Sequence, residues 1–176
     1  MAYPGFRVTL AVKLDKMKDP IQIDIGVGDA VIPVEKSFHP FEYRGKPIFE
    51  GEISLLTYPV ETIFAEKLQT IILKGPTNSR MKDYHDLILI MREAGLIDLS
   101  ELKRAVSATF QNRRTELRLP IAFEADGIAS LQRLWTEHLA GLDEFRAKLA
   151  LPETIEHVLS EINAWLTANQ FGRTPR

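Results

Sequence analysis

The chain has 176 residues, of which 45% are hydrophobic and 26% are charged, with 22 Lys and Arg against 24 Asp and Glu and no cysteine. This size and apolar content are enough for a buried core, which excludes intrinsic disorder, and a net charge of -2 excludes a polybasic nucleic-acid or lipid binder. The lack of cysteine excludes disulfides, thiolate zinc sites and cysteine nucleophiles. Because it contains no signal-peptide core and no apolar run of about 20 residues, we expect a soluble cytoplasmic protein without membrane spans.

The first third of the chain shows the two-residue period of β-strands. Apolar side chains alternate over residues 6–14 and again over 21–27, which predicts two strands that pair antiparallel. Residues 16–20 are expected to form the polar turn between them. Residues 28–51 are rich in Pro and Gly and are predicted to be a loop, and 53–58 are predicted to be a short third strand.

From Pro59 onward the apolar residues follow the period of helices. Asn78 or Ser79 is expected to cap the second helix, and Ser100 the third. The predicted helices cover residues 59–73, 78–93, 100–110, 131–138 and 155–166. The pattern therefore predicts an α+β protein: antiparallel strands in a β region over residues 1–58, followed by a helical domain over 59–176.

Lys67 interrupts the apolar face of the first predicted helix. On a helical wheel it lies near the middle of the apolar arc, four residues after Ile63 and four before Ile71. A lysine in that position either extends its ammonium out to solvent or meets an anion. A lysine ammonium that is partly buried from solvent is suited to binding the phosphates of a nucleotide.

Three further charged residues are candidates. Arg80 and Asp83 are neighbours on the second predicted helix, and they form either an ion pair beside the core or part of a polar site facing the first helix. Asp24 alternates with isoleucines in the second strand, so it is either a solvated strand residue or a ligand for a hard cation such as Mg²⁺. One carboxylate does not make a metal site, so Asp24 needs partners.

The histidines and tryptophans show weaker patterns. The four histidines share no metal-ligand spacing, so no histidine metal cluster is expected. Trp135 and Trp165 occupy apolar stripes of predicted helices and are expected in the core.

Three segments together resemble the AbiEii/AbiGii family of nucleotidyltransferase-like toxins from bacterial toxin–antitoxin and abortive-infection (phage-defence) systems. They are IQIDIGVGDAVIP at 21–33, YPVETIFAEKLQTII at 58–72 and NSRMKDYHDL at 78–87. The resemblance spans about residues 3–95. It implies part of a polymerase-β-like nucleotidyltransferase sheet followed by a helical domain.

The resemblance also implies functions for the candidate residues. Asp24 would be a catalytic carboxylate that binds the metal, Lys67 would be a catalytic residue that contacts the triphosphate, and Asp83 would be a catalytic acid lining the cleft with the nucleotide-binding Arg80 beside it. The implied cofactor is Mg²⁺ and the implied substrate a nucleoside triphosphate. The implied partners are an RNA acceptor such as tRNA, or a protein acceptor, and a cognate antitoxin.

The sequence departs from the family pattern in one respect. The family's G-[GS] and D-x-D motifs, which hold the catalytic metals, do not occur in it. We therefore expect a truncated or split reading frame that is inactive by itself, with an unpaired sheet edge that favours self-association or a partner strand. The alternative to a nucleotidyltransferase toxin is a non-catalytic interaction module that binds an antitoxin or itself.

Overall fold

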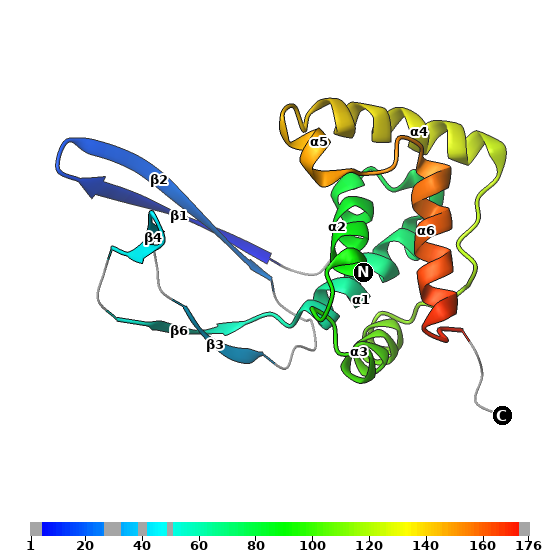
Figure 1. The fold of residues 1–176 in the computed structure, drawn as a ribbon, viewed down its shortest axis with the longest axis horizontal. Helices are drawn as coiled ribbons and strands as arrows, with labels where there is room; N and C mark the ends of the chain where they lie inside the picture. Colours follow the sequence, from blue (N-terminus) through cyan, green and yellow to red (C-terminus); the bar gives the residue numbers. More distant parts are fainter. Residues whose placement is uncertain (1–4, 27–32, 39–41, 49–50, 173–176) are drawn as a thin grey trace. The chain divides into compact units, whose positions relative to one another are not determined.

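The computed structural model describes residues 5–26, 33–38, 42–48 and 51–172. Antiparallel strands come first and helices follow, which confirms the α+β class (Figure 1). The chain divides into two compact units, residues 1–30 and 31–176. The division at residues 58 and 59 stays a prediction.

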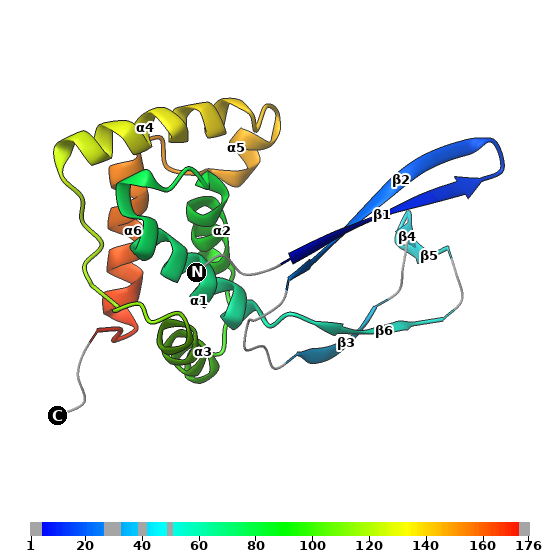
Figure 2. The same ribbon diagram turned by 180° about the vertical axis from the view of Figure 1, so that it is seen from behind.

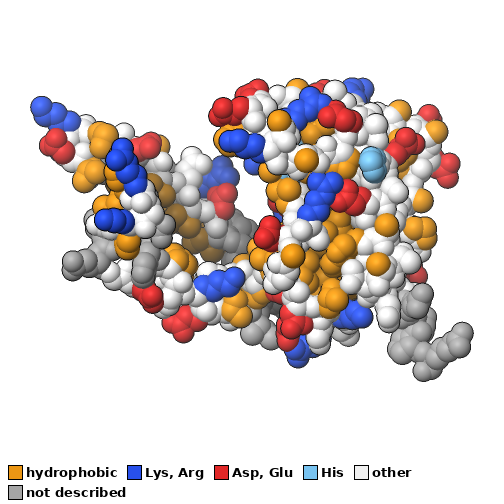
Figure 3. Space-filling view, viewed as in Figure 1, with side chains coloured by type: hydrophobic (Ala, Val, Ile, Leu, Met, Phe, Trp, Pro, Cys, Tyr) orange, Lys and Arg blue, Asp and Glu red, His pale blue; other side chains and the backbone are white. Residues whose placement is uncertain are grey.

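The first unit contains a long antiparallel hairpin of β1 (Gly5–Leu14) and β2 (Met17–Gly26). Its register places the alternating apolar residues of both strands on one face, because Phe6 lies opposite Ile25 and Val8 opposite Ile23. The predicted turn over 16–20 is wrong in its extent, since the turn occupies only Asp15 and Lys16 and pairing continues from Met17. Hydrophobic and charged side chains both reach the surface of this hairpin (Figure 3).

The second unit begins with short strands, and the first three of them contradict the loop predicted over 28–51. They are β3 (Val34–Phe38), β4 (Glu42–Tyr43), β5 (Lys46–Pro47) and β6 (Ile53–Thr57). β3 pairs antiparallel with β6, and β4 pairs with β5 around a turn in which Arg44 and Gly45 both have positive φ, at 53° and 72°. β6 confirms the predicted third strand.

The helices of the second unit agree with the predicted periods. They are α1 (Val60–Lys74), the 3-10 turn η1 (Gly75–Thr77), α2 (Met81–Arg92), α3 (Leu99–Asn112), α4 (Ala125–Ala140), α5 (Phe145–Leu149) and α6 (Ile155–Ala168). The short α5 was not predicted. None of the helices in the described ranges is long and apolar enough to cross a membrane.

Two helix starts differ from prediction. α3 is capped by Asp98 and not by Ser100, because the Asp98 carboxylate accepts hydrogen bonds from the backbone N–H groups of Ser100 and Glu101 at 2.8 and 3.0 Å. α2 begins after Arg80, and the Asn78 side chain accepts a hydrogen bond from the Arg80 N–H at 3.0 Å. Asn78 therefore orders the approach to α2 without being its N-cap residue.

The helices enclose one apolar core. α1 packs against α2 and α3, and α6 packs against α2 and α4 (Figure 1, Figure 2). Trp135 of α4 is fully buried, as predicted, and its indole N–H donates to the Pro152 carbonyl at 2.9 Å. Trp165 of α6 is partly buried and stacks on Phe171. This core fixes the faces that α1, α2 and α4 present to one another.

Candidate functional site

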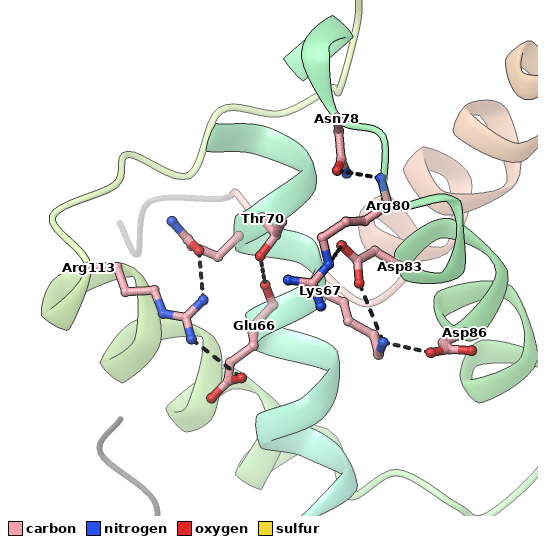
Figure 4. Close-up of polar contacts among 9 residues, drawn as sticks. Glu66, Lys67, Thr70, Asn78, Arg80, Asp83, Asp86 and Arg113 are labelled. Atoms are coloured by element: carbon pink, nitrogen blue, oxygen red, sulfur yellow. Dashed lines mark hydrogen bonds and ion pairs between the residues drawn. The ribbon is translucent and has the colours of Figure 1, made fainter. Parts of the chain in front are cut away.

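The apolar face of α1 carries Lys67 to the boundary with α2. Phe64 and Leu68 are fully buried on either side of it in sequence, whereas the Lys67 side chain keeps 18% of its surface exposed. Figure 4 shows the ammonium directed toward the carboxylates of α2. Of the two alternatives for this lysine, the structure therefore shows the one in which it meets an anion.

The charges around Lys67 form one cluster. The Lys67 Nζ lies 2.6 Å from Oδ2 of Asp86 and 3.5 Å from Oδ1 of Asp83, and Nε of Arg80 lies 3.4 Å from the other Asp83 oxygen. The Asp83 side chain is only 2% exposed, so its charge relies on these two cations. Both pairs involving Asp83 are long. The structure thus holds a buried carboxylate loosely between two basic groups that can also reach other anions.

This cluster lines a hollow with a volume of about 490 Å³ between α1, α2 and α4. Its basic groups are Lys67, Arg80 and Lys82, and its acidic groups include Asp83 and Asp86. α4 supplies the remaining wall through Leu134, Glu137 and His138. The hollow therefore combines cations from two neighbouring helices with a wall from a third that is distant in sequence.

A second polar network lies on the other side of α1 and ties it to the end of α3. Gln69 is buried, accepts a hydrogen bond from Arg113 at 3.0 Å and donates one to Thr115 at 2.7 Å. The Arg113 guanidinium also lies 3.4 Å from Glu66 (Figure 4). Glu66 in turn accepts a hydrogen bond from the Tyr58 hydroxyl. These contacts hold α1 in a fixed rotational setting, which orients Lys67.

Asp24 lies in the hairpin of the first unit. Both carboxylate oxygens accept hydrogen bonds from the Arg7 guanidinium, at 2.6 and 2.9 Å, and this contact lowers the pKa of Asp24. Among the described residues, no group of three or more His, Asp or Glu is placed to hold a metal ion. Asp24 is thus a single carboxylate already paired with Arg7, and a cation at Asp24 would have to displace that guanidinium.

The structure brings three of the four predicted site residues together. Lys67, Arg80 and Asp83 form the cluster beside the hollow, whereas Asp24 belongs to the other compact unit. Convergence of Asp24 with the other three stays a prediction.

Comparison with protein families decides the identity of the chain. The family model described as nucleotidyl transferase AbiEii toxin, type IV TA system, matches residues 2–161. The chain belongs to the AbiEii family. No curated protein and no solved structure matches it. The AbiEii match confirms the resemblance seen in the three motifs and extends it beyond residue 95, through α3 and α4 into α6.

Sequence reasoning on this AbiEii chain missed part of the hollow. Asp86 is the closest partner of Lys67, and its spacing of three residues from Asp83 was the signal that could have found it. Glu137 and His138 carry no such signal, because they reach the hollow only through the packing of α4 on α2.

Proposed function

We propose that this AbiEii chain acts as part of a nucleotidyl transferase toxin and binds the triphosphate of a nucleoside triphosphate in the hollow between α1, α2 and α4. The acceptor is an RNA such as tRNA, or a protein, the cognate antitoxin is its partner, and the site of action is the cytoplasm. One observation carries the proposal: the largely buried Lys67 ammonium faces a hollow that also presents Arg80 and Lys82.

The basic side chains suit a chain of phosphates. Lys67 supplies a compact positive charge on a wall that is mostly removed from water, where charge–charge attraction is stronger than in bulk solvent. Arg80 is 62% exposed, so its guanidinium can turn from Asp83 to a phosphate oxygen. Both groups would stabilise negative charge on the pyrophosphate that leaves when a nucleotide is transferred.

The acidic side chains keep the site ready in the absence of nucleotide. Asp83 and Asp86 neutralise Lys67 while no phosphate is bound, which offsets the cost of burying its charge. An incoming phosphate then replaces a carboxylate as the partner of the ammonium. Asp83, which stays buried beneath Arg80, holds the two basic groups in place during this exchange.

We extend the proposal to Mg²⁺ as the cofactor of the transfer reaction, with Asp24 as one ligand. The pairing of Asp24 with Arg7 requires that Arg7 give up the carboxylate before Asp24 can bind a cation. The triphosphate contacts of Lys67 and Arg80 do not depend on this step, so nucleotide binding can be tested with and without Mg²⁺.

Isothermal titration calorimetry of the full chain with GTP, ATP, CTP and UTP tests the proposal. At least one nucleotide is expected to bind, and Lys67→Gln is expected to weaken it about tenfold or more, because the central positive charge is lost. Lys74→Gln is the matched control, since Lys74 is an exposed lysine at the end of the same helix. Wild-type protein that binds no better than Lys67→Gln would overturn the proposal.

A non-catalytic interaction module is the second candidate, and the hairpin favours it. Its apolar side chains remain well exposed, with Phe6 at 66% and Ile25 at 45%. If no nucleotide binds, and light scattering shows self-association or a stable complex with the antitoxin, this second function replaces the first.

A further inference from the structure

Two histidines from different helices meet beside the hollow. Nδ1 of His85 on α2 lies 3.1 Å from Nε2 of His138 on α4, and their rings stand edge to face with centroids 5.2 Å apart. The His138 ring also stacks on Trp135, with centroids 5.3 Å apart. Because Trp135 is fully buried, this stacking fixes the imidazole that α4 directs at α2. The pair is a direct polar link between the two helices.

The surroundings of the pair favour the neutral form of both imidazoles. Partial burial is the main cause that lowers the pKa of His85 and of His138, and the nearby ammonium of Lys82 adds to it. Lys67 acts in the same direction on His85, whereas Asp86 opposes the shift in both.

Two further carboxylates lie on the helices that carry the pair and on α6. Glu137 of α4 lines the same hollow, and Glu161 of α6 is already held by Arg92 of α2 in a bidentate ion pair at 2.7 and 2.8 Å.

The geometry limits how many protons the pair can carry. A hydrogen bond between two imidazole nitrogens needs one N–H donor and one lone pair. One added proton leaves this arrangement intact, because it occupies a ring nitrogen outside the contact. A second added proton places N–H groups on both facing nitrogens, so the hydrogen bond is lost and two positive rings repel each other at short range.

We infer that His85 and His138 form a positioning pair that clamps α4 against α2 and releases it when both imidazoles are protonated. The clamp holds Leu134, Glu137 and His138 as the α4 wall of the hollow. Its effect on nucleotide binding rests on the proposed function. The clamp itself does not, because the contact between α2 and α4 exists without a ligand.

The sign of the pH dependence follows from the lowered pKa values. The clamp is fully formed above the ordinary imidazole pKa of about 6.5, and it weakens as the pH falls below that value through the lowered pKa values of the pair. If release abolishes the nucleotide site, the Kd for nucleotide rises up to about tenfold per pH unit for each proton taken up.

The first test is an NMR titration of the four histidines in the full chain, combined with hydrogen exchange of α4 at pH 7.5 and 5.5. His85 and His138 are expected to titrate together and below the ordinary imidazole pKa of about 6.5, and α4 amides are expected to lose protection at pH 5.5. His138→Gln keeps an amide that can bond to His85 but cannot be charged, so its α4 protection should be nearly independent of pH. His157→Gln, an exposed change on α6, is the matched control.

Independent titration of the two histidines at ordinary pKa values would overturn the inference, as would equal loss of α4 protection in wild type and His138→Gln. If His138→Gln does not fold, the same measurements on His85→Gln and the titration of the wild-type histidines test the inference. ATP titration at both pH values is the second test. Absence of ATP binding at pH 7.5 counts against the proposed function, whereas the NMR and exchange results judge the clamp separately.

Discussion

Lys67 lies closer to the accessible carboxylate of Asp86 than to the buried one of Asp83. The separation is 2.6 Å from Nζ to Asp86 and 3.5 Å to Asp83, and the two acidic side chains are 38% and 2% exposed. The solvent-accessible carboxylate of Asp86 is thus the closer ion-pair partner of the Lys67 ammonium. Asp86 is therefore the group that a phosphate has to displace, while Asp83 remains beneath.

Asp86→Asn is expected to tighten nucleotide binding by about two- to tenfold, because the substitution removes the anion that competes for Lys67. Calorimetry with the best-binding nucleotide measures the change. Asp126→Asn removes the same charge from an exposed position on α4 and serves as the control. Weaker binding in Asp86→Asn would mean that this carboxylate assists the ligand and does not compete with it.

Gln69→Leu is expected to destabilise the protein by about 1–3 kcal/mol, since it removes hydrogen bonds to Arg113 and Thr115 at a position that is 1% exposed. Urea denaturation measures the loss. Gln111→Leu makes the same change at an exposed position of α3, where about 0.5 kcal/mol or less is expected. Equal effects of the two substitutions would contradict the assigned role of the network.

Gly127→Ala is expected to destabilise the protein by about 1 kcal/mol, although alanine is the better helix former. A Cβ at Gly127 would lie 2.8 Å from Cγ of Pro76, and the rigid proline ring cannot move aside. Gly141→Ala, where an added Cβ meets its neighbours at 3.6 Å or more, should not lower the melting temperature. An increase in stability for Gly127→Ala would show that η1 and α4 pack less tightly than described.

Arg7→Gln is expected to raise the pKa of the Asp24 carboxyl back to its ordinary value of about 3.9, because the hydrogen bond from Arg7 is the largest cause of its lowering. In wild type the lowered pKa favours the folded state above that value, and this contribution is lost as the pH falls through the lowered pKa. A carbon-detected NMR titration of Asp24 measures both proteins. An identical pKa in the two would show that the pair does not form in solution.

Regular, repeated patterns made the long elements predictable. β1 and the later part of β2 follow from the alternation over residues 6–14 and 21–27, and α1 and α6 follow from several complete helical turns. β4, β5 and α5 have two, two and five residues, too few for a period to show. The α3 cap was misplaced because Asp98 and Ser100 are both good capping residues, and the Glu61 carboxylate that accepts the Asp98 N–H comes from another helix.

The site was predictable only where a residue conflicted with its own helix. Lys67 was found because a charge on an apolar arc is conspicuous, and Asp83 for a similar reason. His138 was not, because a histidine in an amphipathic helix is unremarkable until tertiary packing brings His85 to it.

Glu66 and Lys67 are successive residues of α1 with partners on different segments, since Glu66 faces Arg113 at the end of α3 and Lys67 faces Asp83 and Asp86 of α2. A slip of one residue turns a helix by about 100°. A slip in one direction would set Glu66 against the carboxylates of α2, and a slip in the other direction would set Lys67 against Arg113, so either slip would bring like charges together. The order of two adjacent charges thus selects one rotation of α1, independently of its apolar stripe. An insertion of one residue near Glu66 would therefore be destabilising through charge repulsion as well as through lost apolar packing.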